Sequence, residues 1–129
     1  MFTLQEIKDA HAKVKSGADF PQYIRDLKVL GVVRYETYVS DGHTSYYSEN
    51  GGTVISEEKY DFLEVEKVSD ISGFKKGLKE HQDGKSDYMG FCRMCAESGV
   101  EKWVVSIGEM SCSYFDVEGG MMLEERIPE

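Results

Sequence analysis

The chain has 129 residues and carries 24 acidic against 15 basic side chains, a formal net charge of −9. This length suits one domain with a single core. The acidic balance argues against nucleic acid as a partner, because affinity for nucleic acid comes largely from Lys and Arg neutralising phosphates. No apolar stretch approaches the roughly 20 residues needed to cross a bilayer, so no membrane partner is expected. Three cysteines form no paired disulfide framework and favour a reducing cytoplasm.

The first half of the chain predicts two helices followed by three strands. Thr3 and Glu6 have the spacing of a capping box, and the first helix is expected to end at Ser16-Gly17. Asp19 is the predicted N-cap of a second helix, and Gly31 stands where a helix C-terminus favours a left-handed residue. Alternation and turn residues then predict three strands, at 32–39, 44–48 and 53–56.

The second half predicts the same order of elements. Residues 57–69 have the pattern of a connector. An apolar stripe from Ile71 to His81 predicts a helix, and Asp87 is the predicted N-cap of another helix that ends at Gly99. Three further strands are predicted at 100–107, 110–117 and 121–127.

An internal repeat is the strongest signal in the sequence. A shift of 68 positions superposes caps, turn glycines and alternating core positions of the two halves, at Asp19/Asp87, Gly31/Gly99, Ser45-Tyr46/Ser113-Tyr114 and Gly51-Gly52/Gly119-Gly120. This predicts a single domain, 1–129, with pseudo-repeats 1–56 and 70–127 joined by the connector. Because a three-stranded meander is too small to bury its own face, we expect an α+β fold of tandem duplicated ααβββ units. The antiparallel sheet would have its helices packed on one face.

Cys92 and Cys95 form a C-x-x-C pair that could serve redox or metal chemistry. The repeat argues against this, because Ile24 and Leu27 occupy the equivalent positions in the first half. Buried structural thiols are therefore the favoured interpretation, and neither a metal nor a cofactor is predicted. Cys112, alone on a strand, is weak evidence for a nucleophile.

The repeat also indicates where two of the histidines lie. A shift of 67 places His11 on Leu78 and His81 on Val14, so both are expected to be half-buried on helical stripes that face the sheet. An acid–base role for His81 is the minority interpretation. His43 falls in a loop and is expected to be solvated.

One face of the predicted sheet combines tyrosines with charged side chains. The side chains expected to face the helices are Val33, Tyr35, Val39, Trp103, Val105 and Ile107. Those assigned to the opposite, open face are Arg34, Glu36, Tyr38, Tyr46, Lys102 and Tyr114. Amphipathic aromatics among charges are typical of interaction sites. An ordinary solvated sheet face with stabilising cross-strand pairs explains the same pattern equally well.

These patterns lead to a binding or accessory module in the cytoplasm as the first hypothesis, with a protein or small ligand as its partner on the open face. The alternative is a small enzyme that uses His81 with Asp116 or Glu36 in a cleft between the repeats. A third hypothesis, acidic mimicry of nucleic acid, requires carboxylates aligned along one surface. Exposed strand edges would also allow two copies to pair as a homodimer.

Several short motifs of the second half resemble the YdfO-like family of bacterial and prophage-borne proteins, some of which carry the label phage envelope protein. The matching residues are His81-Gln82-x-Gly84, Asp87-Tyr88, Phe91-Cys92, Gly99-Val100-x-x-Trp103-Val104-Val105, Met110-x-Cys112-x-Tyr114-Phe115-Asp116 and Glu125-x-Ile127-Pro128. The chain departs from the family pattern at Ser106, where an acidic residue is expected. The resemblance implies a small α+β domain of prophage origin and brings no established activity.

Overall fold

The computed structural model describes residues 1–15 and 17–128. Its helices are α1 (Leu4–His11), α2 (Phe20–Leu30), α3 (Ile71–Gln82) and α4 (Tyr88–Glu97), with a 3-10 turn at Gly17–Asp19. Its strands are β1 (Val32–Tyr38), β2 (Thr44–Ser48), β3 (Thr53–Ile55), β4 (Lys102–Ser106), β5 (Ser111–Phe115) and β6 (Met121–Arg126). The predicted α+β class is confirmed, and two helices followed by three strands occur twice along the described chain.

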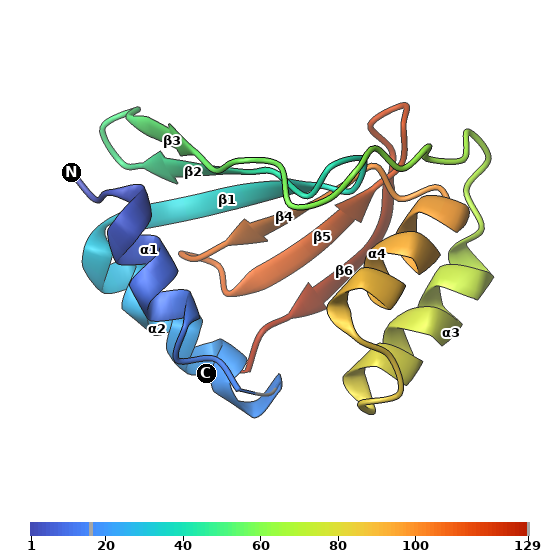
Figure 1. Cartoon of the computed structure of the whole chain (residues 1–129), viewed down its shortest axis with the longest axis horizontal. Coiled ribbons are helices and arrows are strands. Elements are labelled where there is room, and N and C mark those ends of the chain that lie inside the picture. The colour runs from blue at the N-terminus through green and yellow to red at the C-terminus, as the bar shows by residue number, and fades with distance from the viewer. Residues whose placement is uncertain (16, 129) are drawn as a thin grey trace.

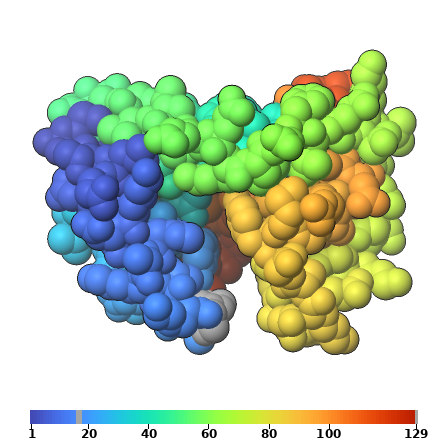
Figure 2. Space-filling model, in the orientation of Figure 1, coloured from blue at the N-terminus to red at the C-terminus, as the bar shows by residue number. Residues whose placement is uncertain are grey.

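The six strands form one antiparallel sheet in the order β3-β2-β1-β4-β5-β6. The first strands of the two halves meet at its centre, where Tyr35 lies opposite Val105. The helix pair α1–α2 packs at one end of the sheet and α3–α4 at the other (Figure 1). A hollow separates the two helix pairs in the space-filling view (Figure 2).

Local sequence signals explain where helices α1 and α4 begin. The Thr3 Oγ1 accepts the Glu6 N–H at 3.2 Å while the Glu6 carboxylate accepts the Thr3 N–H at 2.9 Å, so the capping box is confirmed. Asp87 caps α4 by accepting the Gly90 N–H at 2.7 Å, also as predicted.

The end of the first helix and the cap of the second differ from the prediction. Helix α1 ends at His11, and Ser16, part of its predicted end, lies outside the described residues. Asp19 precedes α2, but its carboxylate accepts the Lys15 N–H at 2.8 Å and makes no capping bond to the helix. Pro21, the second residue of α2, has no N–H to offer such a cap.

The core contains side chains of both halves on the helix-covered face of the sheet. Ile24 and Leu27 of α2 and their counterparts Cys92 and Cys95 of α4 are all inaccessible to solvent, as the repeat predicted. Residues 57–70 lack helices and strands. This connector is fixed by Tyr60, whose hydroxyl donates to the Val39 carbonyl at 2.7 Å.

Two predicted core positions are wrong. A β-bulge lies between Val32 and Arg34, so Val32 is buried and Val33, the expected core residue, is 37% exposed. His11 is exposed and only meets the ring of Tyr23 edge-on, with 5.3 Å between ring centroids.

Candidate interaction face

Four of the predicted binding residues lie on the open face of the sheet. On β1, Tyr35 is buried against the helices, so its neighbours Arg34 and Glu36, and then Tyr38, point to the opposite side. Lys102 of β4 lies opposite Tyr38 in the ladder and shares its face. Two neighbouring central strands therefore bring these four side chains together.

Tyr46 and Tyr114 lie on the other face, so the predicted placement of both residues is wrong. Tyr46 stands opposite Tyr35 in the β1–β2 ladder, and Tyr114 stands opposite Trp103 in the β4–β5 ladder. Directly paired residues share a face of a sheet. Tyr46 is 9% exposed and Tyr114 6%, with the Tyr114 ring packed on Phe74 of α3.

Glu36 links the two cations of the open face. Its carboxylate lies 3.0 Å from the Lys102 Nζ and 3.3 Å from the Arg34 Nε, and the Tyr38 hydroxyl donates to it at 3.4 Å. Only 12% of the Glu36 side chain is exposed. Partial burial alone would raise the pKa of this carboxyl, but the hydrogen bonds and charges of Lys102 and Arg34 outweigh burial and hold the pKa below its usual value. Glu36 is thus an ionised acceptor that fixes both cations.

Aromatic rings lie beneath both cations. The Arg34 guanidinium carbon lies 4.0 Å from the centroid of the Tyr47 ring. The Lys102 Nζ lies 5.7 Å from the Tyr38 ring and 5.8 Å from the Phe115 ring. These separations are within the range of cation–π attraction. We call this set the interaction face, and its members are Arg34, Glu36, Tyr38, His43, Tyr47, Lys102 and Phe115.

Tyr47 and Phe115 were missed as members of this face, although the sequence held a signal for them. They are 68 positions apart and each follows a tyrosine that the structure buries. Because side chains alternate along a strand, Tyr46 and Tyr47 must lie on opposite faces of the sheet. The sequence alone does not show which of the two rings faces the helices. The ladder with β1 decides this, and it places Tyr47 opposite Arg34.

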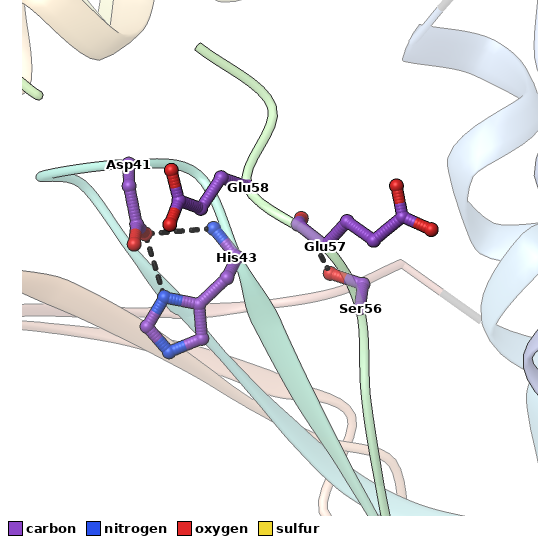
Figure 3. A pocket seen from close by; sticks show the side chains of 5 residues that line it. All are labelled: Asp41, His43, Ser56, Glu57 and Glu58. Atoms are coloured by element: carbon purple, nitrogen blue, oxygen red, sulfur yellow. Dashed lines mark hydrogen bonds and ion pairs between the residues drawn. The ribbon is translucent and has the colours of Figure 1, made fainter. Parts of the chain in front are cut away.

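The interaction face ends at a His–Asp pair in the β1–β2 turn. The His43 ring stacks on Tyr38 with 4.5 Å between centroids, and its Nδ1 lies 2.6 Å from the Asp41 Oδ1 (Figure 3). Asp41 also accepts the His43 backbone N–H at 3.0 Å. Burial of Asp41 would raise its pKa, but these contacts with His43 hold that pKa low. His43, expected to be solvated, keeps 30% of its side chain exposed, but Asp41 and Tyr38 fix its ring.

Acidic residues surround this pair. An open hollow of about 560 Å³ is lined by Asp41, His43, Ser56, Glu57 and Glu58. In Figure 3 the Glu58 carboxylate extends toward Asp41, whereas Glu57 points away from His43. Because Asp41 holds Nδ1, the Nε2 of His43 is the ring atom left for a partner. This end of the face can therefore donate or accept one directed hydrogen bond.

The residues of the enzymatic alternative do not converge. His81 stacks on Phe91 with 4.5 Å between centroids, and its Nδ1 lies 2.9 Å from the Ser86 hydroxyl. Glu36 lies on the opposite face of the sheet, bound to Lys102. Asp116 accepts the backbone N–H groups of its own turn, including that of Gly120 at 2.8 Å. His81, Glu36 and Asp116 are thus not assembled into an acid–base pair.

The comparisons with known proteins give the chain a family. A model described as "Protein of unknown function (DUF1398)" matches residues 8–126. The chain belongs to this family. It is also similar to the protein named "Uncharacterized protein YcgX" of Escherichia coli (strain K12), with 19% identity over 115 residues that cover 89% of this chain and 86% of that protein.

Membership of the DUF1398 family assigns no residue a role. No helix within the described ranges is long and apolar enough to span a bilayer. Within those ranges, no group of three or more His, Cys, Asp or Glu side chains is placed to hold a metal ion. The YdfO-like resemblance and a prophage origin stay predictions.

Proposed function

We propose that this chain is a protein-binding accessory module that acts through the interaction face. The observation that carries the proposal is the fixed position of Arg34 and Lys102, each stacked over an aromatic ring and both bound to Glu36. Arginine and aromatic residues are enriched at protein interfaces, and rigid side chains lose little entropy when a partner binds.

The chemistry of the face suits a protein surface that presents both carboxylate and apolar groups. The Arg34 side chain is 47% exposed, and only its Nε is engaged with Glu36. Its terminal nitrogens have no hydrogen-bond partner among the described residues, so they can bind a partner carboxylate, which arginine holds in bidentate geometry. The Tyr38 and Tyr47 rings beside it offer area for apolar contact. Acidic mimicry of nucleic acid requires carboxylates aligned along one surface. On this face Arg34 and Lys102 flank Glu36, which argues against that hypothesis.

The enzymatic alternative has less support because His81, Asp116 and Glu36 lie in three different parts of the fold. For the same reason we favour binding over catalysis. The three free, buried cysteines support action in a reducing compartment, so we place the module in the cytoplasm. The edge strands β3 and β6 offer unpaired backbone groups for a homodimer, which stays a prediction.

The test is affinity capture from lysate of the native cell, with bound proteins quantified by mass spectrometry. We expect the double variant Tyr38→Ala/Tyr47→Ala to lose about tenfold or more of a specific partner, because buried interface aromatics typically contribute over 1 kcal/mol each. Phe62→Ala is the matched control, since Phe62 is an aromatic on the connector with 75% exposure. Circular dichroism verifies that all variants are folded. Equal recovery of every partner by wild type and double variant would refute the proposal.

A further inference from the structure

A row of cationic and aromatic side chains crosses the interaction face from β5 to the β1–β2 turn. Phe115 stands opposite Lys102 in the β4–β5 ladder, and Lys102 stands opposite Tyr38 in the β1–β4 ladder. The His43 ring then stacks on Tyr38, with 8° between the ring planes. Because β4 and β2 flank β1 on opposite sides, Lys102 and His43 approach Tyr38 from opposite sides. We call Phe115, Lys102, Tyr38 and His43 the cation–aromatic row.

The position of His43 in this row is fixed by its turn. The Nδ1 atom lies 2.6 Å from the Asp41 Oδ1, and Asp41 is an ionised acceptor because its pKa lies below the ordinary value. The connector holds the turn in place, since the Lys59 N–H donates to the Asp41 carbonyl at 2.8 Å and the Leu63 N–H donates to the Ser40 carbonyl at 2.7 Å. The ring therefore keeps its place in the row in either protonation state.

Protonation of His43 changes what its second ring nitrogen can do. Figure 3 shows this nitrogen, Nε2, on the side of the ring turned away from Asp41. When Nδ1 donates its hydrogen to Asp41, Nε2 has a lone pair in the neutral ring and a charged N–H in the protonated ring. Histidine is the side chain that ordinarily changes charge between about pH 5 and 8. A fall in pH thus turns Nε2 from an acceptor into a cationic donor.

Charged groups reach His43 from three elements. Asp41 lies on its own turn, and Glu57 and Glu58 of the connector line the same open hollow. Lys102 of β4 lies beyond the Tyr38 ring, 5.7 Å from its centroid. With a neutral His43, three carboxylates dominate this end of the face and repel an anionic partner. A protonated His43 reduces that repulsion and offers a charge-assisted hydrogen bond.

The other titratable neighbours of His43 change this balance little. Lys59 of the connector lies beside Gly42 of the turn, but its single exposed cation offsets only part of the three carboxylates. Burial raises the pKa of Tyr38 and of Tyr60, so both phenols stay neutral over the physiological range. The charge at this end of the face therefore changes through His43.

We propose that protonation of His43 strengthens the binding of a partner carboxylate at the cation–aromatic row, so that the interaction face holds its partner more tightly as the pH falls. The Nε2–H of His43 donates to the carboxylate, and an apolar group beside that carboxylate contacts the Tyr38 ring. This inference rests on the proposed protein-binding function and adds the chemistry of the partner and its regulation.

The test uses N-acetylphenylalanine, which joins one carboxylate to an aromatic ring, as a probe on the full-length protein. Its carboxylate is ionised at both pH 6 and pH 8, so only the protein changes charge. Binding is followed by NMR through the backbone amides of β1 and β4. We expect a Kd about fivefold lower at pH 6 than at pH 8, the size of effect typical of a partly exposed ion pair. The uncharged amide of the same probe should have equal Kd values at both.

Three variants separate His43 from other sources of pH dependence. His43→Gln cannot become a cation and should bind the probe weakly at both pH values. His43→Arg keeps a permanent charge beside Asp41 and should bind it tightly at both. His11→Gln is the matched control, since His11 is exposed on α1 away from the interaction face, and it should keep the fivefold response.

The outcomes that would overturn the inference differ from those that would refute the proposed function. Equal Kd values at pH 6 and pH 8 in the wild type would overturn the role of His43, and so would a pH response that survives in His43→Gln. Absence of probe binding at pH 6, or NMR shifts only outside the interaction face, would overturn carboxylate binding at the row. If His43→Gln does not fold, a pH response that persists in His43→Arg overturns the inference instead. The proposed function is judged separately, by protein capture with Tyr38→Ala/Tyr47→Ala.

Discussion

Glu36 and Val104 lie directly opposite each other at the centre of the sheet, and they are 68 positions apart. Sixty-eight is also the shift that superposes the two halves of the sequence. Two copies of one unit related by a twofold axis would place such equivalent residues face to face on the axis. The central ladder is therefore the place where the halves meet as equivalents.

The hairpins on either side agree with this relationship. Tyr35 pairs with Tyr46 in the first half, and Trp103 pairs with Tyr114 in the second, each pair displaced by the same 68 positions. The interaction face repeats the pattern, since Tyr47 and Phe115 stand beneath Arg34 and Lys102. Duplication itself stays a prediction, but the chain has the pairing that duplication would produce.

Replacing Glu36 should change how stability depends on pH. The folded pKa of Glu36 is lowered from 4.5, so its contribution is present above that pH and is lost as the pH falls through the folded value. At pH 7 we expect the free energy of unfolding of Glu36→Gln to be about 2 kcal/mol lower than that of wild type, because hydrogen bonds to a charged group contribute roughly that much. Urea denaturation at pH 7 and pH 3 measures the difference, which should shrink at pH 3.

Glu58→Gln is the matched control for Glu36. Glu58 is an exposed carboxylate beside the turn, and its replacement should leave stability within about 0.5 kcal/mol of wild type at both pH values. A difference between Glu36→Gln and wild type that stays constant from pH 7 to pH 3 would contradict the assigned role of Glu36.

The cysteines should be inert in the folded protein. Burial raises the pKa of Cys92 and Cys95, and it raises that of Cys112 to about 12. Because the thiolate is the reactive form, Ellman's reagent at pH 8 should label none of them quickly in the native state and all three in denaturant. Ser72→Cys, at an exposed position of α3, supplies the positive control. Rapid native labelling of Cys92 or Cys95 would revive the redox interpretation.

Neighbouring tyrosines should differ sharply in what they contribute to stability. Tyr46 is buried between Tyr35 and the helices, so Tyr46→Ala should lower the free energy of unfolding by about 3 kcal/mol or more. Tyr47→Ala removes a partly exposed ring that contacts Arg34. This substitution should lower the free energy of unfolding by about 1 kcal/mol. Thermal unfolding of both variants measures the difference. Equal losses would mean that the assignment of faces is wrong.

Most elements of this fold could be predicted because their signals are local. Thr3 and Asp87 have capping spacings that the structure uses, and Gly31 and Gly99 both adopt the left-handed conformation expected at helix ends. The repeat then predicted that Cys92 and its neighbour on the helix stripe face the core, as they do.

The candidate site could not be predicted to the same extent because it depends on pairing between strands. The bulge after Val32 shifts one residue out of the core, and no local pattern announces it. The side on which Tyr46 lies is set by its partner across the ladder, and the contact of His43 with Asp41 is set by the conformation of a turn.

Gly31 and Gly99 occupy equivalent positions of the two halves but should respond differently to alanine. Both have positive φ, +100° and +86°, so alanine is strained at either site. A Cβ at Gly99 would also lie 2.8 Å from the Val68 carbonyl oxygen of the connector, whereas at Gly31 it meets no described atom within 4 Å. We expect a loss of about 1 kcal/mol for Gly31→Ala and at least about 2 kcal/mol for Gly99→Ala, measured by urea denaturation.

The difference between these two variants isolates the packing of the connector from the strain of the backbone. Gly108→Ala is the control, since its φ is not positive and its Cβ meets no described atom, so its effect should stay within about 0.5 kcal/mol. If Gly99→Ala loses no more free energy of unfolding than Gly31→Ala, the connector does not pack closely against the end of α4. Another contact would then have to hold the connector in place, and Tyr60→Phe, which removes the hydrogen bond to the Val39 carbonyl, would be the next variant to measure.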